Sequence, residues 1–385
     1  MSKAVVMTPP SVPEPGSSSR RSAIKAGLAL AGITALGTAG RATSAFALGA
    51  PTQAGAQPGS DFDFNAPELV ARDLQVPWGL DFRPDGSALI TQRSIGHITR
   101  IRLGEEPVMM GALIGRETGE GGVLGLAVSP TYEDDGLVYV YVTNDAQSRV
   151  VRMQLGSRAE TIFGGIAAAD VHNGGRIAFG PDGHLYVATG DAGVASRAQD
   201  PASPNGKILR ITPDGDPAPD NPDPSSPVYS LGHRNVEGLA WDAQGRLWAT
   251  ELGEDAFDEV NLIEPGANYG WPELEGVSSA GGDFVNPQVT WSPEQASPAG
   301  CCVIGNTLYV AALRGERLWA VPITEDGLGD PVTVLIGFGR LRTVAAAPDG
   351  TLWLTSSNRD GRGDPVGGDD RIIRFTPRSW AEGQP

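Results

Sequence analysis

Short apolar segments with alternating polar residues recur along the chain, and each follows a tight-turn sequence. The turns are Pro-Asp-Gly at Pro84–Gly86, Pro181–Gly183 and Pro348–Gly350, and shorter Gly-containing pairs elsewhere. Gly and Asn accept the positive φ that a tight turn between antiparallel strands demands, so each copy predicts a β-hairpin. The strands predicted after the turns are Ala88–Thr91, Leu137–Val140, Leu185–Thr189, Leu247–Thr250, Leu308–Val310 and Leu352–Thr355.

A second apolar strand follows each of the six copies. These strands are His97–Leu103, Arg149–Leu155, Lys207–Ile211, Glu259–Ile263, Arg317–Ile323 and Arg371–Phe375. The repeat length is about 54 residues, which is typical of a four-stranded propeller blade with long loops. A two-sheet sandwich is the alternative, but it does not need six matched units. The pattern predicts an all-β, six-bladed β-propeller over residues 61–385.

The first 47 residues have the order of an export signal. Ser19–Lys25 contains a twin arginine, Ala26–Gly40 is uncharged and mostly small or apolar, and a small-x-small cleavage site ends at Ala47. The apolar stretch is too short to span a bilayer. We therefore expect export by the twin-arginine route to the periplasm or the medium, with 48–60 as a flexible lead-in. The alternative is an Ala-rich helix that stays attached.

Charge narrows the range of partners. The chain carries a formal net charge of -17. Such a surface repels phosphate backbones and anionic lipids, which argues against nucleic-acid and membrane partners, whereas it suits hard cations such as calcium.

The only two cysteines are adjacent, Cys301 and Cys302. Adjacent thiols do not supply the spread ligands of a metal site. They could form a vicinal disulfide in an oxidising compartment, or be two small buried residues.

Two of the four histidines stand out. His97 and His184 adjoin turns and are expected at the surface. His172 and His233 each lie in an irregular, Gly-flanked segment directly before a strand. Polar residues in such loops at the mouth of a propeller are candidate site groups.

Several of these segments resemble the glucose/sorbosone dehydrogenase family, in order and at the family's spacing, from Val76 to about Phe375. The matching segments are Glu120–Gly125, His172–Arg176, Thr189–Asp191, Gly206–Arg210, Gly232–Asn235, Asp258–Ile263, Asn268–Pro272 and Asn358–Gly363. The resemblance implies a pyrroloquinoline quinone (PQQ) over the central channel, a calcium ion beside it, and oxidation of an aldose at its anomeric carbon to a lactone.

The resemblance also implies roles for individual residues. His172 matches the base that takes the proton from the anomeric hydroxyl while hydride passes to the quinone, and Asp191 matches the carboxylate that orients this base. Arg234 matches a residue of both the catalytic and the quinone site, and Glu120 falls near the sugar. A loop histidine bonded to backbone and a turn-capping Asp are the alternatives for the first two.

A quinone with three carboxylates needs a local cationic cluster in so acidic a chain. The quinone ligands implied by the resemblance are Glu120, Arg234, Asn235, Trp291, Arg314, Arg340 and Arg342. On a strand Arg340 and Arg342 would point to the same side, as two ligands of one anion should. A solvated charged rim is the alternative for each Arg, and a core position for Trp291.

The resemblance implies two calcium-binding sites. The family's catalytic ion binds the backbone carbonyls of a Gly-Pro pair, which is Gly253-Glu254 here. The loss of Pro removes a fixed φ from that loop. A second, structural ion would use Glu259 and the region of Tyr269, whose oxygens suit a hard cation.

The predicted function is therefore a PQQ-dependent aldose sugar dehydrogenase, with a sugar as substrate and an external electron acceptor. The alternatives are a non-catalytic ligand-binding propeller and a calcium-dependent, lactonase-type hydrolase. Neither alternative requires His172 together with a cluster of arginines. The sequence does not specify the sugar, the acceptor or the oligomeric state.

Overall fold

The computed structural model of the chain describes residues 59, 61–115, 119–144, 147–278 and 283–378. The predicted export signal lies outside the described residues, as does the lead-in apart from Gly59. No helix among the described residues has the length and apolar character that crossing a membrane requires.

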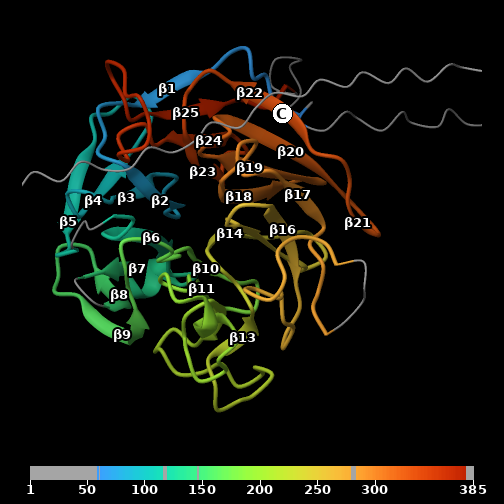
Figure 1. Cartoon of the computed structure of the whole chain (residues 1–385). Coiled ribbons are helices and arrows are strands. Elements are labelled where there is room, and N and C mark those ends of the chain that lie inside the picture. The colour runs from blue at the N-terminus through green and yellow to red at the C-terminus, as the bar shows by residue number, and fades with distance from the viewer. Residues whose placement is uncertain (1–58, 60, 116–118, 145–146, 279–282, 379–385) are drawn as a thin grey trace, which may run out of the picture. The chain divides into compact units, whose positions relative to one another are not determined.

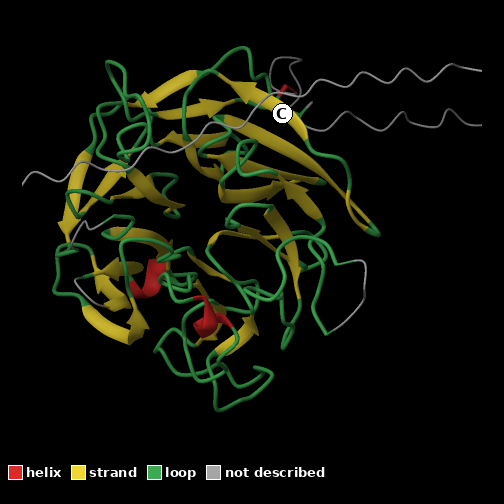
Figure 2. Ribbon diagram, in the orientation of Figure 1, coloured by secondary structure: helices red, strands yellow, loops and turns green. Residues whose placement is uncertain are grey.

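Six antiparallel sheets follow one another along the chain (Figures 1 and 2). The first strands of the sheets are β2 (Pro77–Phe82), β6 (Val123–Val128), β10 (Ile177–Phe179), β14 (Val236–Trp241), β18 (Pro298–Ile304) and β23 (Leu341–Ala346). The second strands are β3 (Ala88–Gln92), β7 (Leu137–Thr143), β11 (Leu185–Ala188), β15 (Leu247–Glu251), β19 (Thr307–Ala312) and β24 (Leu352–Ser356).

The outer half of each sheet completes the blade. The third strands are β4 (His97–Ile101), β8 (Gln147–Gln154), β12 (Lys207–Ile211), β16 (Asp258–Ile263), β20 (Arg317–Thr324) and β25 (Ile372–Phe375). The fourth strands are β5 (Val108–Ala112), β9 (Glu160–Ala167), β13 (Val228–Leu231), β17 (Val289–Trp291), β22 (Val332–Ile336) and β1 (Glu68–Ala71). Short additional elements are β21 (Gly327–Leu328), the helix α1 (Tyr132–Asp135) and the 3-10 turn η1 (Ala195–Ala198).

The first strands line the centre of a closed ring. Strand β2 contacts both β6 and β23, β18 contacts both β14 and β23, β6 contacts β10, and β11 contacts β14. The last blade takes its outer strand from the start of the described chain, because β1 pairs with β25. This pairing joins the two ends of the propeller. The predicted six-bladed β-propeller is confirmed.

The predicted strand repeats correspond to the second and third strands of the blades. Their buried faces pack between neighbouring sheets: Leu89 and Ile98 of the first blade, for example, join Val140 and Val151 of the second in one apolar cluster. This packing of each blade on the next explains why the aliphatic alternation recurs six times.

Cys301 and Cys302 on β18 are free thiols in this structure, in contrast to the suggested vicinal disulfide. Cys301 is buried and Cys302 is half-buried. Successive residues of a strand point to opposite faces of the sheet, which separates the two side chains.

A candidate quinone and sugar site at the centre of the ring

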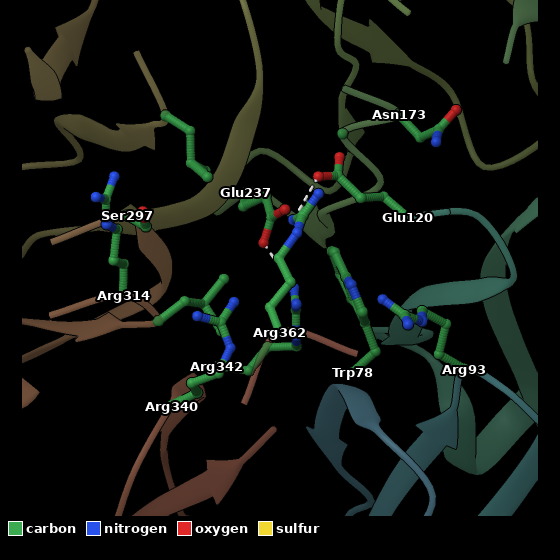
Figure 3. A pocket seen from close by; sticks show the side chains of 13 residues that line it. Trp78, Arg93, Glu120, Asn173, Glu237, Ser297, Arg314, Arg340, Arg342 and Arg362 are labelled. Atoms are coloured by element: carbon green, nitrogen blue, oxygen red, sulfur yellow. Dashed lines mark hydrogen bonds and ion pairs between the residues drawn. The ribbon is translucent and has the colours of Figure 1, made fainter. Parts of the chain in front are cut away.

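Residues from all six blades line one cavity of about 380 Å³ (Figure 3). Because only the centre of the ring is within reach of every blade, the cavity lies on the axis, at the end where the second strand of each blade turns into the third. The lining residues are Trp78, Arg93, Glu120, Asn173, Gly174, Glu237, Leu252, Ser297, Leu313, Arg314, Arg340, Arg342 and Arg362.

The cavity lining carries five arginines and only two glutamates. Two of the arginines are already ion-paired on its floor. Arg342 Nη1 lies 2.8 Å from Glu237 Oε2, and Arg340 Nε lies 2.9 Å from Oδ2 of Asp360. Burial opposes ionisation of Asp360, but the attraction of Arg342 and Arg340 holds its pKa below the usual value. Burial raises the pKa of Glu237 in spite of Arg342.

An indole and a buried guanidinium form the centre of the floor. The Arg176 guanidinium carbon lies 4.4 Å from the ring centroid of Trp78. Arg176 Nε donates to the carbonyl of Glu237 at 2.8 Å, and Nη2 donates to Thr343 Oγ1 at 3.1 Å. Below this layer the innermost strands line a second cavity of about 310 Å³. The Trp78–Arg176 pair therefore separates two cavities along the axis.

His172 and Asp191 form a hydrogen-bonded pair beside the cavity. Nδ1 of His172 lies 2.8 Å from Oδ1 of Asp191, and the imidazole is 18% exposed. The next two residues, Asn173 and Gly174, line the cavity. His172 has a φ of 55°, a left-handed conformation that costs a non-Gly residue free energy. Its N–H donates to Oε2 of Glu120 at 2.7 Å, which anchors this conformation.

Asp191 is buried and fully bonded. Oδ1 also accepts the N–H of Gly193 at 2.8 Å, and Oδ2 accepts the indole N–H of Trp271 at 2.9 Å. Burial alone would raise its pKa, but the bond and charge of His172 and the donors Trp271 and Gly193 hold the pKa of Asp191 below its usual value. The carboxylate therefore stays ionised and acts only as an acceptor.

Close backbone packing fixes the loop of His172. A Cβ on Gly174 would lie 2.7 Å from the nitrogen of Gly190, so a larger residue cannot occupy this position. The side-chain oxygen of Asn235 accepts the N–H of Gly174 at 2.9 Å. Lys207 holds the neighbouring loop, because its ammonium donates to three backbone carbonyls. These carbonyls belong to Arg197, Ala198 and Asn205, at 2.8 to 2.9 Å.

The other expected quinone ligands have different surroundings. The Arg234 guanidinium carbon lies 5.4 Å from the ring centroid of Trp271, and its Nε is buried without a hydrogen-bond partner. Arg314 is 56% exposed at the cavity edge and pairs with Glu294 at 3.0 Å. Trp291 does not line the cavity. It is buried between blades, and its ring centroid lies 5.5 Å from that of Trp319. Trp291 is therefore a core residue, which was the alternative to a quinone ligand.

The expected calcium ligands are spread along one blade. The Gly253 N–H donates to Asp258 Oδ1 at 3.0 Å, and the Glu254 N–H donates to Glu275 Oε1 at 2.7 Å, so the N–H groups of this loop are committed to carboxylates.

The side chains suggested for a second ion already have other partners. Glu259 accepts from Gly276 and Asn261, and the Tyr269 hydroxyl donates to the Leu262 carbonyl at 2.6 Å. Within the described residues no group of three or more His, Cys, Asp or Glu could hold a metal ion.

Sequence reasoning missed several lining residues. Trp78, Arg93 and Glu237 lie on or next to strands whose alternation indicates only a buried face. A signal exists for Arg93, because it occupies the hairpin loop between second and third strands that carries Arg314 in another blade. Arg362 lies in a matched segment but was assigned no role.

Comparisons with known proteins show the family of the chain. The family model described as Glucose / Sorbosone dehydrogenase matches residues 74–373. The PQQ-bound aldose sugar dehydrogenase of Streptomyces coelicolor is 47% identical, with a TM-score of 0.78 over 83% of this chain and 99% of that chain. An uncharacterized protein of Synechocystis is 31% identical over an alignment of 346 positions, which covers 74% of this chain and 83% of that protein. Quinoprotein glucose dehydrogenase B of Acinetobacter calcoaceticus is 28% identical over 56% of this chain and 54% of its own length. The chain belongs to the glucose/sorbosone dehydrogenase family.

Proposed function

We propose that this protein oxidises aldoses at the anomeric carbon to lactones, with PQQ bound in the central cavity. The observation that carries the proposal is one cavity lined by five arginines, beside a hydrogen-bonded His172–Asp191 pair. The chain as a whole carries a net charge of -17, so a local excess of positive groups indicates a polyanionic ligand.

The residues of the cavity fit a flat tricarboxylate. Arg340 and Arg342 on the floor and Arg314 at the edge would hold its carboxylates, since guanidinium groups bind carboxylates bidentately. The indole of Trp78 also lines the cavity and offers a planar apolar surface. The buried Nε of Arg234 has no hydrogen-bond partner and is a further donor for the same anion. When bound, the quinone supplies a two-electron acceptor for the hydride of the sugar.

The proposed general base is Nε2 of His172. Ionised Asp191 can only accept a hydrogen bond, so Nδ1 of His172 carries the proton of that bond. The lone pair is then on Nε2, which takes the proton from the anomeric hydroxyl as hydride leaves the anomeric carbon. Asp191 also stabilises the imidazolium that forms. A positioned base of this kind contributes about 10² to 10⁴ in rate.

Calcium is part of the proposal through backbone oxygens. The carbonyls of Gly253 and Glu254 would be the protein ligands of the ion, and carbonyl oxygens are ligands that calcium prefers. The N–H groups of this loop are held by Asp258 and Glu275, which supports a fixed loop without the Pro of the family. The ion would supply a Lewis acid next to the quinone.

We further propose that the protein is exported by the twin-arginine route and that an external acceptor reoxidises the quinone. A change of Arg20 and Arg21 to Lys would then retain the precursor in the cell. N-terminal sequencing of exported protein would begin after Ala47 if the predicted cleavage site is used. Secretion of the double variant at the wild-type level contradicts this route.

Reconstitution tests the activity. The purified apoprotein is titrated with PQQ and calcium, and dye reduction is followed against a panel of aldoses. We expect stoichiometric quinone binding, turnover with aldoses and loss of turnover in His172→Ala with quinone binding retained. An apoprotein that is folded and calcium-loaded but takes up no quinone overturns the proposal.

A further inference from the structure

Trp271 lies between the two halves of the site and touches both. Its indole N–H donates to Asp191 Oδ2 at 2.9 Å, and the guanidinium of Arg234 lies over its ring at 5.4 Å. We propose that Trp271 is a positioning residue, which fixes the proton-accepting pair through its N–H and the quinone-binding arginine through its ring. This inference rests on the proposed function.

The N–H bond matters because Asp191 has no solvent to replace it. Asp191 is 1% exposed, and its other oxygen is shared by His172 and Gly193. Without the indole N–H, Oδ2 would be a buried anionic oxygen short of a donor. The carboxylate would rotate toward another donor, and the imidazole that is hydrogen-bonded to it would no longer be held in the orientation that proton transfer requires. The expected loss is therefore in the chemical step.

The ring contact acts on a different group. The Arg234 backbone N–H donates to Glu251, and Nη1 donates to the Leu252 carbonyl at 3.2 Å, but Nε has no hydrogen-bond partner. The face of Trp271 therefore supports a guanidinium whose Nε donor has no hydrogen-bond partner among the described residues. Removal of the ring would loosen this donor and weaken binding of the quinone.

Trp271 is itself rigidly held. Trp271 is 8% exposed. Its backbone N–H donates to the Gly232 carbonyl at 2.9 Å, and its backbone carbonyl accepts from Gln199 Nε2 at 2.7 Å. Gly232 lies two residues before Arg234, so one loop holds the backbone of Trp271 and also carries the arginine that lies over its ring. Trp271 is held through its backbone, and its indole contacts Asp191 through the N–H and Arg234 through the ring face. Such a residue is suited to aligning these two side chains with each other.

The chain contains a matched control in Trp248 on β15. Its indole N–H donates to Asp242 Oδ2 at 3.0 Å, and the Arg246 guanidinium lies 5.2 Å from its ring centroid. Asp242 and Arg246 flank the turn between β14 and β15, at the opposite end of the blade from the central cavity. Trp248 therefore has the same two interactions as Trp271, in a place with no proposed catalytic role.

Three variants test the inference in the quinone- and calcium-loaded protein: Trp271→Phe, Trp271→Leu and Trp248→Phe. Trp271→Phe keeps an aromatic face and loses the N–H, so we expect kcat to fall about 10- to 100-fold. The KM for the aldose and the quinone Kd, measured by calorimetry on the apoprotein, should stay within about 2-fold of wild type. Trp271→Leu should lose kcat and also weaken quinone binding about 5-fold or more. Trp248→Phe should lower only the melting temperature.

The outcomes separate the two proposals. Wild-type protein that neither binds quinone nor oxidises aldoses overturns the proposed function and this inference together. Wild-type turnover with a kcat of Trp271→Phe equal to that of Trp248→Phe overturns the inference alone, as does an equal loss of kcat and quinone affinity in Trp271→Phe. If Trp271→Phe does not fold, benzothienylalanine at position 271 replaces it, because this isostere removes only the N–H donor.

Discussion

Glu120 and His172 are 52 residues apart in the chain, and the Glu120 carboxylate accepts the His172 backbone N–H at 2.7 Å. Its other oxygen lies 2.7 Å from Nη1 of Arg362. Glu120 therefore connects the strained backbone of the proposed base to a cationic group of the cavity. This gives a physical role to a residue that the sequence placed only near the sugar.

Two substitutions of Glu120 separate its hydrogen bond to the His172 backbone from its negative charge in the cavity. Glu120→Gln keeps an oxygen for the N–H of His172, so kcat should stay within about 3-fold of wild type. It also removes a negative charge from a cavity that receives an anion, so the quinone Kd should fall. Glu120→Ala leaves the left-handed His172 backbone without its anchor, and we expect a kcat about 10- to 100-fold lower. Steady-state kinetics and calorimetry check both, and equal kcat values for the two variants would contradict the anchoring role.

Asp191→Asn tests the orientation of the base. An Asn can present its amide NH₂ to Nδ1 of His172, which moves the imidazole proton to Nε2 and removes the proposed proton acceptor. The expected kcat is about 10³-fold below wild type, with quinone binding unchanged. The matched control is Asp182→Asn, which changes a carboxylate near His184 away from the cavity. Normal turnover of Asp191→Asn would refute the assignment.

The Arg342–Glu237 pair on the cavity floor allows stability and binding to be measured separately. Both side chains are buried, so Arg342→Met leaves a buried carboxylate without its partner and should lower the free energy of unfolding by about 3 to 5 kcal/mol. Adding Glu237→Gln removes that charge and should restore most of the stability. Quinone affinity should stay at least about 10-fold weaker than wild type in both variants. Recovery of wild-type affinity in the double variant would show that Arg342 does not bind the anion.

Local sequence signals were sufficient for the repeating part of the fold. The turn before Leu185–Thr189 and the apolar alternation after it depend on neighbours in the chain, and β11 and β12 form at those positions. The pairing of β1 with β25 was not predicted, because it joins residues about 300 positions apart and changes no local pattern. Ring closure is a property of the assembled blades.

Residues of the candidate site could be predicted only in segments that resemble the glucose/sorbosone dehydrogenase family. His172, Asp191, Arg340 and Arg342 stand in recognisable segments, and the structure brings them to one end of the axis. Glu237 gave no signal, since a buried carboxylate in an apolar strand is explained only by Arg342, which reaches it from another blade. Trp291 shows the converse limit, because an aromatic residue in sequence does not reveal whether it faces a cavity or a neighbouring Trp.

The two cysteines give a prediction that needs no cofactor. Burial raises the pKa of the Cys301 thiol to about 12 and that of Cys302 well above its usual value, so neither forms a reactive thiolate at neutral pH. Native protein should therefore resist alkylation, and protein unfolded without reductant should take up two alkyl groups. Mass spectrometry that finds no label and a mass two hydrogens lower would establish the vicinal disulfide instead.

Asp81 on β2 links two neighbouring blades, because its Oδ2 accepts the N–H of Val128 on β6 at 2.8 Å. Burial raises the pKa of Asp81 from 3.8 to about 6, although the N–H groups of Val128 and Phe82 oppose this. Between these values the native state binds more protons than the unfolded state. The contribution of Asp81 to stability therefore falls as the pH rises from about 4 to about 6 and is constant above.

The side chain introduced by Asp81→Asn cannot ionise. The free energy of unfolding of this variant should therefore lack the decrease that ionisation of Asp81 causes in the wild type as the pH rises. The difference between wild type and variant should change by at most about 3 kcal/mol between pH 4 and pH 6.5, in the direction that favours the variant at the higher pH. Other carboxylates titrate in both proteins, so the difference isolates Asp81 from the acidic remainder of the chain. Urea unfolding at pH 4, 5 and 6.5 measures it, and a difference that is independent of pH would mean that Asp81 has an ordinary pKa in the folded protein.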